Sequence, residues 1–272
     1  MIEIERAFLE KSAIRFGKKE VAVPAIIDCI PDGKLQDDQR FHLWEEYAPK
    51  YHRMLKLRCT TEGWNQMKDL LPKDNGGVVL DAGCGTGEIL ESLTRRLHSA
   101  RIIGADVSPA FLRRAQQRIA TTLPSEAHRI SLWRVDLTQP LPWKHDTFDL
   151  VTMNFVFQYF SEAEQKNLLA GLSDVLKDRG ELYLSTFIKG VDFKNVVRRA
   201  IPREAISNPI GLLQALTIVP VTKKFDAFKN IGQMNNPTQE ELLSWCQESG
   251  FSQVQKKVEI FDGAGVIIKA TK

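Results

Sequence analysis

The chain has 272 residues, of which 43% are hydrophobic and 26% are charged, close to the average for globular proteins. A chain of this length can bury a full core as one large domain, or as one domain with a small cap. Its formal net charge of +3 is too small to indicate a nucleic-acid or membrane partner by itself.

The cysteines and the apolar runs exclude further classes. No C-x-x-C spacing occurs, so neither a metal site nor a disulfide framework is expected. The four cysteines are Cys29, Cys59, Cys84 and Cys246. The first six residues, MIEIER, lack the pattern of a signal peptide, and no apolar run reaches the roughly 18 residues of a membrane span. We therefore expect a cytoplasmic protein.

The N-terminal part predicts a lead-in followed by helices. Residues 1–38 mix charges with short apolar runs and indicate only a short strand or hairpin. From Asp38 to Leu71 the pattern is helical, and one face carries an aromatic stripe. The stripe consists of Phe41, Trp44, Tyr47, Tyr51 and Leu55. It either packs on the main domain or caps a site with Tyr47 and Tyr51 facing a ligand, and the two are compatible. Residues 1–72 are interpreted as an N-terminal extension and helical cap.

Residues 78–90, VVLDAGCGTGEIL, indicate a buried strand, a glycine-rich turn and a helix. Glycine permits positive φ and lets a ligand approach the backbone, and the free N–H groups of the next helix give the turn a partly positive end. Dinucleotide sites use G-x-G-x-x-G, whereas Gly83, Gly85 and Gly87 follow G-x-G-x-G. Asp81 would repel a pyrophosphate. The turn therefore favours a ligand with an ammonium or sulfonium group.

Strands and helices alternate after this turn. Strands are predicted at 101–106, 129–135, 148–153 and 181–187, and helices at 87–98, 109–121 and 161–177. This alternation predicts a parallel sheet with right-handed crossovers, whose ligands bind at the carboxyl ends of the strands. Asp81, Asp106 and Asp136 all fall at such predicted ends.

Residues 188–236 interrupt the alternation. They combine an apolar centre, Pro209 to Val221, with several basic residues. The basic residues around this centre include Arg198, Arg199, Arg203, Lys223 and Lys224. A helix from Pro237 to Ser249 follows, and then an antiparallel strand pair at 253–260 and 266–271. We interpret residues 73–272 as the main domain and 188–236 as a lid-like insertion.

The stretch from Val78 to the C-terminus resembles the class I S-adenosylmethionine-dependent methyltransferases. The D-x-G-x-G-x-G run matches motif I, and Asp106 matches the acid that ends the second strand. Val135-Asp136-Leu137 matches the adenine-contacting position, and Phe148 to Asn154 matches the motif of strand four. The resemblance implies an α/β fold with a seven-stranded, mostly parallel Rossmann-like sheet, helices on both faces and the strand order 3-2-1-4-5-7-6, with the last strand antiparallel.

The same resemblance implies S-adenosylmethionine as the cofactor. The implied cofactor-binding residues are Asp81, Ala82, Gly83, Cys84, Gly85, Gly87, Asp106, Val107, Asp136, Leu137 and Asn154. Asp106 would accept both ribose hydroxyls, Asp136 would accept from the adenine amino group, and Val107 and Leu137 would sandwich the ring. Tyr51 and Tyr159 are the candidate catalytic residues, facing the substrate.

A closer resemblance is to the methyltransferases of ubiquinone and menaquinone synthesis. Trp44 to Tyr51 is similar to their upstream F-x-x-x-A-x-x-Y segment, and Pro237 to Phe251 is similar to their C-terminal region. Their F-G-x-R-N after strand four is replaced by Phe155 to Tyr159. The resemblance therefore implies the cofactor and leaves the substrate open. The apolar insertion favours a small lipophilic or aromatic acceptor, with its basic residues resting on anionic lipid headgroups.

Three other functions compete with this one. A nucleic-acid or protein methyltransferase could dock its substrate on the basic insertion, although Asn154 to Phe157 lacks the N-P-P-[YF] motif of base-amino methylation. A non-catalytic cofactor-binding module is argued against by the intact acids, and a dinucleotide oxidoreductase by the glycine spacing. We expect a small-molecule substrate and no stable nucleic-acid partner, and leave the oligomeric state open.

Overall fold

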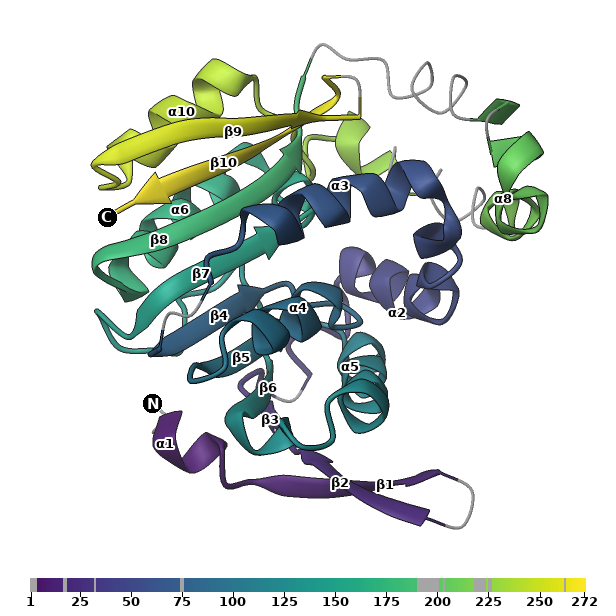
Figure 1. Ribbon diagram of the computed structural model, residues 1–272. Coiled ribbons are helices and arrows are strands. Elements are labelled where there is room, and N and C mark those ends of the chain that lie inside the picture. The colour runs from purple at the N-terminus through teal and green to yellow at the C-terminus, as the bar shows by residue number, and fades with distance from the viewer. Residues whose placement is uncertain are drawn as a thin grey trace.

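The computed structural model describes residues 4–16, 19–31, 33–73, 76–189, 201–202, 204–217, 224, 227–261 and 263–272. Its centre is a sheet with the strand order β3-β6-β5-β4-β7-β8-β10-β9 (Figure 1). The strands are β3 (Ile26–Asp28), β4 (Val78–Ala82), β5 (Arg101–Asp106), β6 (Ile130–Arg134), β7 (Phe148–Asn154), β8 (Leu176–Phe187), β9 (Gln253–Ile260) and β10 (Gly265–Thr271). Only β10 runs antiparallel to its neighbours. The expected strand order and the antiparallel final strand are thus confirmed.

The sheet has eight strands, so the predicted number of seven is wrong by one. The additional strand is β3, which pairs in parallel with β6, with Ile27 opposite Trp133. Three residues are too few to show a period of two, so the sequence pattern could not separate this strand from the lead-in. The predicted hairpin lies just before it, as β1 (Lys11–Phe16) and β2 (Lys19–Pro24), which form their own two-stranded sheet. Residues from the N-terminal extension therefore complete the main sheet.

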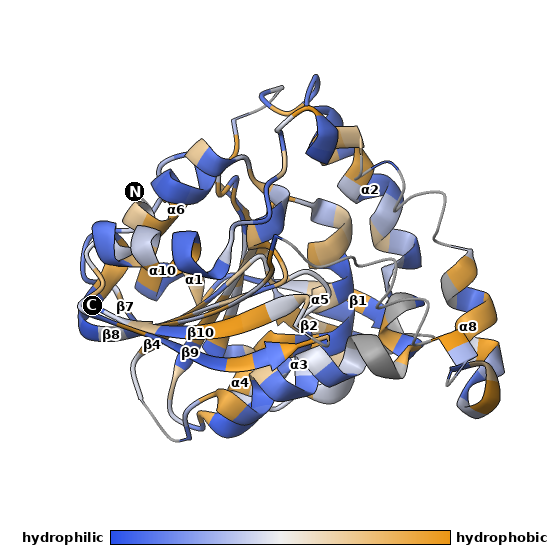
Figure 2. Ribbon diagram, turned by 90° about the horizontal axis from the view of Figure 1, so that it is seen from above, coloured by the Kyte–Doolittle hydropathy of each residue, from blue (hydrophilic) through white to orange (hydrophobic). Residues whose placement is uncertain are grey.

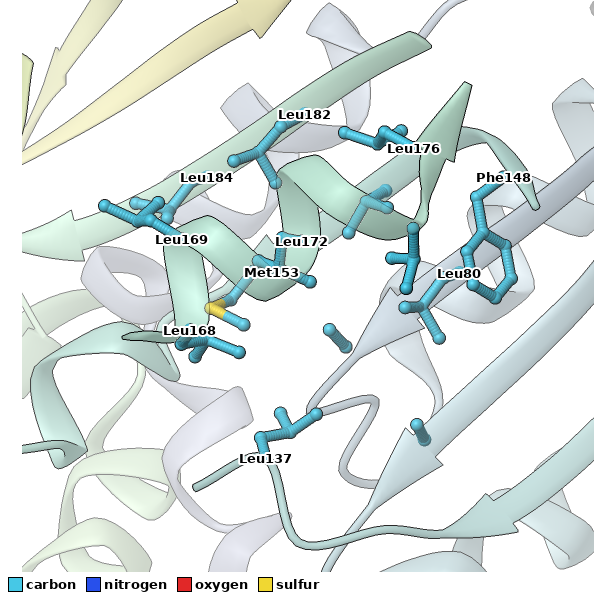
Figure 3. Close-up of a cluster of buried hydrophobic side chains, with 14 of the residues drawn as sticks. Leu80, Leu137, Phe148, Met153, Leu168, Leu169, Leu172, Leu176, Leu182 and Leu184 are labelled. Atoms are coloured by element: carbon cyan, nitrogen blue, oxygen red, sulfur yellow. The ribbon is translucent and has the colours of Figure 1, made fainter. Parts of the chain in front are cut away.

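Helices pack on both faces of the sheet and separate two cores. On one face lie α6 (Glu162–Val175), α10 (Gln239–Glu248) and the short α1 (Ile4–Ala7), over the cluster shown in Figure 3. There Leu168, Leu169 and Leu172 of α6 pack against Met153 and Leu184 of the strands. On the other face α4 (Glu88–Arg96) and α5 (Pro109–Thr122) enclose the second core.

The helix starts follow the sequence signals. Ser108 caps α5 by accepting a hydrogen bond from Phe111 N, and Ser161 and Thr238 form capping boxes at α6 and α10. Each cap satisfies a backbone donor that an uncapped helix end leaves unpaired. These local signals explain why the predicted helix starts agree with the observed ones.

Two further helices, α2 (Gln39–Tyr51) and α3 (Arg58–Leu70), lie on the side to which the arrowheads of β4 and β7 point (Figure 1). The 3-10 turn η1 (Met54–Lys56) joins them, and η2 (Ala127–Arg129) and η3 (Phe157–Tyr159) lie elsewhere in the main domain. Stacked aromatic rings hold α3 to the sheet. They are Trp64, Phe155, Phe187 and Phe261. The predicted helical cap is therefore present at the carboxyl ends of the strands.

In the insertion, α8 (Pro209–Leu216) lies at the periphery beyond α3 (Figure 1), and residues 204–207 and 227–230 are also helical. The helix α8 contacts η1. Of the predicted basic residues, Arg198, Arg199, Arg203 and Lys223 lie outside the described residues. Within the described part of the chain, no helix is long and apolar enough to cross a membrane.

Candidate functional site

The glycine-rich turn leaves β4 with all three glycines in the left-handed region. Their φ angles are 75° at Gly83, 52° at Gly85 and 85° at Gly87. The turn is pinned to β5, because Gly83 N and Cys84 N donate to the carbonyl of Ala105 at 2.7 and 2.9 Å. A Cβ on Gly83 would lie 2.3 Å from Val156, whereas a Cβ on Gly85 would meet nothing within 4 Å. The turn is thus closed against the protein at Gly83 and faces open space at Gly85.

Asp106 ends β5 beside this turn. Its Oδ2 accepts from Gly85 N at 3.0 Å, and its Oδ1 accepts from Ser108 N at 2.9 Å. Burial raises the pKa of Asp106 to about 6, against the opposing effect of these hydrogen bonds, and the neighbouring Glu45 raises it further. A carboxylate oxygen has two lone-pair sites, so each oxygen of Asp106 can still accept a hydroxyl donor.

Asp81 is 1% exposed, inside β4. Thr152 Oγ1 donates to its Oδ1 at 2.8 Å, whereas its Oδ2 has no hydrogen-bond partner among the described residues. Burial raises the pKa of Asp81 to about 7. A buried carboxylate oxygen without a partner is costly, and the site therefore calls for a donor, either a ligand group or a bridging water.

Asp136 lies two residues after β6, next to the end of β5. The two strand ends are tied together, since Val135 N donates to the carbonyl of Asp106 at 3.0 Å. Asp136 Oδ1 accepts from the backbone N and the hydroxyl of Thr138 at 3.0 and 2.7 Å. Leu137 is buried in the main core, and Val107 is half-buried. The three predicted acids thus lie at the carboxyl ends of three adjacent strands, β4, β5 and β6.

Asn154, at the end of β7, belongs to a buried hydrogen-bond network. Ser185 Oγ of β8 donates to Asn154 Oδ1 at 2.6 Å and accepts from Phe155 N at 3.1 Å. Gln158 Nε2 donates to the carbonyl of Phe155 at 2.7 Å, and Thr186 Oγ1 donates to Gln158 Oε1 at 3.2 Å. The network fixes the segment that ends in Tyr159. The sequence analysis missed Ser185 and Gln158, because partners some 30 residues apart carry no spacing signal.

The aromatic stripe of α2 brings the two predicted catalytic tyrosines into one cluster. Trp44 stacks edge-on against Tyr159 with ring centroids 4.5 Å apart. Tyr51 packs edge-on against Tyr47 at 5.5 Å and against Phe111 of α5 at 5.3 Å. Such pairs contribute about 0.5–1.5 kcal/mol each beyond their buried area. The stripe thus packs on α5, as the first interpretation expects, and also reaches the segment after β7, while a ligand-facing role of Tyr47 and Tyr51 stays a prediction.

The ionisation of these tyrosines is suppressed by their surroundings. Burial raises the pKa of Tyr51 well above its ordinary value, and the nearby carboxylates of Glu88 and Asp106 raise it further. Burial also raises the pKa of Tyr159. Both hydroxyls therefore stay protonated near neutral pH and act as hydrogen-bond donors or acceptors rather than as bases.

Glu45 of α2 joins the helical cap to the segment that follows β5. Its Oε1 accepts from the hydroxyl of Ser108 and, at 3.3 Å, from Ala110 N. These are the first residues of the loop and helix that follow Asp106. The sequence analysis missed Glu45, because only the folded chain brings α2 to the N-terminus of α5.

A pocket of about 400 Å³ opens at the base of the insertion. Ile188 and Lys189 line it from one end of the insertion, and Gly232 and Met234 to Asn236 from the other. Asn235 fixes this wall by exchanging side-chain and backbone hydrogen bonds with Gln165 of α6. None of the predicted site residues lines this pocket. Among the described residues, no three His, Cys, Asp or Glu side chains gather as metal ligands.

Comparisons with known proteins agree with this geometry. Residues 79–180, from β4 to the start of β8, match a protein-family model described as a methyltransferase domain. A demethylmenaquinone methyltransferase of Lactiplantibacillus plantarum is 26% identical over 223 residues, which cover 78% of this chain and 87% of that protein. A match of this extent includes the glycine-rich turn and most of the remaining chain.

Other relatives match over shorter segments. A malonyl-[acyl-carrier protein] O-methyltransferase of Paenibacillus sp. is 28% identical over 113 residues, which cover 40% of this chain and 38% of that protein. Several curated relatives are matched over about half of their length or less. Among solved structures, an O-methyltransferase family protein from Burkholderia thailandensis has a TM-score of 0.60 at 14% identity, covering 86% of this chain and 62% of that chain. This likeness concerns the fold alone.

Proposed function

Because this chain belongs to the class I S-adenosylmethionine-dependent methyltransferases, near the ubiquinone and menaquinone group, we propose that it methylates a small lipophilic or aromatic molecule. The observation that carries the proposal is the turn at Gly85, open to solvent and flanked by the carboxylates of Asp81 and Asp106. A ligand that carries both a cation and hydroxyl groups fits these acceptors.

The residues present fit S-adenosylmethionine. When bound, it supplies a methyl group already activated by a sulfonium. The unpaired Oδ2 of Asp81 suits a cationic donor, and Asp106 keeps lone pairs free for ribose hydroxyls. Asp136, at the next strand end, would accept from the adenine amino group. The side-chain space at Gly85 is the cradle that a Cβ would fill.

The protein's own contribution is positioning and the exclusion of water. In-line transfer needs the acceptor held near attack distance in a dry site. The cluster of Trp44, Tyr51 and Tyr159 supplies apolar ring surface beside Asp106, while the network around Ser185 holds Tyr159 in place. Protonated tyrosine hydroxyls can orient a polar atom of the acceptor without removing its proton.

The acceptor class is inferred from the walls of the site. The segment after β7, Phe155 to Tyr159, is aromatic and apolar where the resembling family has F-G-x-R-N. It meets the aromatic stripe of α2. Phe155 and Phe157 are buried in the cores, so the half-buried Val156 and Tyr159 are the members of this segment that can face an acceptor. An aromatic or lipophilic acceptor suits such side chains better than a nucleic acid or a protein segment. Because a lipophilic acceptor resides in a membrane, the partner that we propose for the insertion is a lipid surface.

Methyl transfer to a fractionated cell extract tests the proposal. The protein is incubated with S-adenosylmethionine labelled in its methyl group, and the extract is separated into lipid, small-polar, RNA and protein fractions. We expect the label in the lipid or small aromatic fraction. Label in the RNA or protein fraction would replace this function with a macromolecular one, and an absence of transfer despite cofactor binding would indicate a non-catalytic module.

A further inference from the structure

The described part of the insertion exposes large apolar side chains. Most residues of α8 are hydrophobic (Figure 2), and Ile210, Leu213 and Leu216, which recur at three-residue steps, are 71%, 68% and 50% exposed. Ile206, in the helical turn before α8, is 87% exposed. Polar contacts hold the segment before α8 to the protein, since Glu204 is buried and Asn208 Nδ2 donates to the carbonyl of Lys56 at 2.6 Å, while α8 itself buries only Gly211 among its described residues. A surface helix ordinarily turns its apolar side to the protein. Here that side faces outward.

Cations lie next to this apolar face. Arg53 Nη1 donates to Thr217 Oγ1 at 2.6 Å, directly after α8. Arg53, Lys56 and Arg114 are close enough together that all three lower the pKa of His52, after the larger effect of burial. Within the described residues none of these three cations forms an ion pair, and Arg114 only donates to the carbonyl of Pro49.

The nearby acids leave this cluster positive. Glu46 is occupied by an ion pair with Lys224 at 2.6 Å, and Glu204 is buried. Lys224, which the sequence analysis assigned to a lipid-facing group, is therefore neutralised. Among the described residues, the positive charge beside the apolar face comes from Arg53, in the turn between α2 and η1, from Lys56 of η1 and from Arg114 of α5.

We propose that the α8 apolar face, defined as Ile206, Ile210, Leu213 and Leu216, inserts into an anionic lipid surface while Arg53, Lys56 and Arg114 bind its headgroups. An exposed apolar stripe flanked by cations is the pattern of helices that lie in a membrane interface. The charge complementarity singles out an anionic bilayer over a neutral one. This inference rests on the proposed function, because membrane binding would bring the protein to a lipophilic acceptor. The helix α8 lies beyond the cap, on the side of the glycine-rich turn.

Vesicle binding tests the proposal directly. The full chain is sedimented with vesicles of equal parts phosphatidylglycerol and phosphatidylcholine, and with vesicles of phosphatidylcholine alone. We expect at least about tenfold tighter binding to the anionic vesicles. The variant Ile210→Glu/Leu213→Glu should bind them at least about tenfold more weakly, since two side chains lose their place in the lipid. Lys56→Ala should weaken binding about fivefold, as expected for one cation near the surface.

Leu9→Glu provides the matched control. Leu9 is 79% exposed, near the N-terminus, so the change removes an equally exposed apolar side chain away from α8. It should bind vesicles as the parent does. Parent protein that stays in solution with both vesicle types, or an Ile210→Glu/Leu213→Glu variant that still binds as the parent, would overturn the proposal. Ultracentrifugation that finds a dimer, converted to monomer by the same double change, would assign the face to a second copy instead.

The two proposals fail separately. Cofactor binding and methyl transfer to the extract are measured without vesicles. Transfer without vesicle binding rejects only the membrane surface, whereas vesicle binding without any transfer rejects the proposed function.

Discussion

The turn after β4 and the helical cover over it are held in place by different kinds of contact. At the turn, Gly83, Gly85 and Asp106 are fixed by backbone hydrogen bonds to adjacent strands of the sheet. In the cover, α2 is held by aromatic stacking and by the contact of Glu45 with Ser108, and α8 is held by a few polar contacts at η1. We infer that the turn is rigid and specific for the cofactor, while the cover decides the acceptor and can vary.

The substitution Gly85→Val should have the largest effect on cofactor binding at the turn. Its φ of 52° is strained for a β-branched residue, and the new side chain would fill the open space in front of the turn. We expect cofactor binding to be abolished while the fold survives, as measured by calorimetry and circular dichroism. Gly33→Val is the control, because Gly33 has a φ of 79° with only a distant side chain nearby, so it reproduces the strain alone. Normal cofactor affinity in Gly85→Val would mean that the ligand binds elsewhere.

Deleting Asn208 to Val219 should spare cofactor binding and lower turnover. The deletion removes α8, whose main contact is with η1. We expect cofactor affinity to remain within about twofold of the parent value, while turnover of a lipid-borne acceptor in vesicles falls at least about tenfold. Turnover at the parent rate would mean that residues 208–219 serve only to pack against the rest of the protein. Residues 218 and 219 lie outside the described residues, so the described part of this change is 208–217.

Asp106→Ala tests whether the carboxylate binds the cofactor. It removes charge-assisted hydrogen bonds that contribute about 1.5–3 kcal/mol, which corresponds to about 10- to 150-fold weaker binding. Asp28→Ala is a close match, because Asp28 also ends a parallel strand and accepts a backbone hydrogen bond, from Ile30 N at 3.0 Å. Unchanged affinity in Asp106→Ala, or an equal loss in Asp28→Ala, would contradict the assignment of the ribose to Asp106.

The sequence predicts the turn and the sheet better than it predicts the helical cover. The strand ends, the caps at Ser161 and Thr238 and the acids at Asp81 and Asp106 depend on neighbours in sequence, and the structure has them where they were predicted. The contacts of Glu45 and Ser185 join residues that are 63 and 31 positions from their partners. Neither periodicity nor motif spacing reports such pairs, because only packing of the finished fold creates them.

The polarity of α8 was beyond prediction for a related reason. An apolar run in the sequence fits a helix that packs on the core as well as one that faces outward. Which of the two occurs depends on whether the rest of the fold has a surface to receive it. Here Asn208, just before α8, donates to the carbonyl of Lys56, whereas Ile210 and Leu213 of α8 remain exposed.

The buried carboxylate of Asp81 predicts a pH dependence of stability. Burial raises its pKa to about 7 from an ordinary value near 3.8, so the folded protein binds a proton that the unfolded chain has lost. The unfolding free energy therefore falls as pH rises between about 4 and 7. As pH rises through this window in the absence of cofactor, the unfolding free energy of Asp81→Asn should increase by about 1–3 kcal/mol relative to that of the parent.

Denaturant unfolding at pH 5 and at pH 8 measures this difference. Asp106 also has a raised pKa, about 6, and contributes to the parent's pH dependence, so the subtraction of Asp81→Asn isolates Asp81. The same variant should bind the cofactor more weakly at pH 8, because the carboxylate charge is gone. A parent and variant with parallel pH profiles would place the carboxylate in a solvated environment.

The smallest expected effects concern the two tyrosines of the cover. Tyr51→Phe and Tyr159→Phe keep the rings and their stacking with Phe111 and Trp44, and remove only the hydroxyls. If those hydroxyls orient the acceptor, each change removes one neutral hydrogen bond of about 0.5–1.5 kcal/mol, so kcat/KM should fall about two- to tenfold with cofactor affinity unchanged. Because burial raises the pKa of both hydroxyls, the pH profile of kcat should not shift, as it would if a general base were lost. Tyr183→Phe is the control, since the hydroxyl of Tyr183 donates to Glu181 within β8 and lies outside the cluster. Parent activity in both variants would mean that the two rings only line the site. Catalysis would then depend on the backbone and the acids at the strand ends.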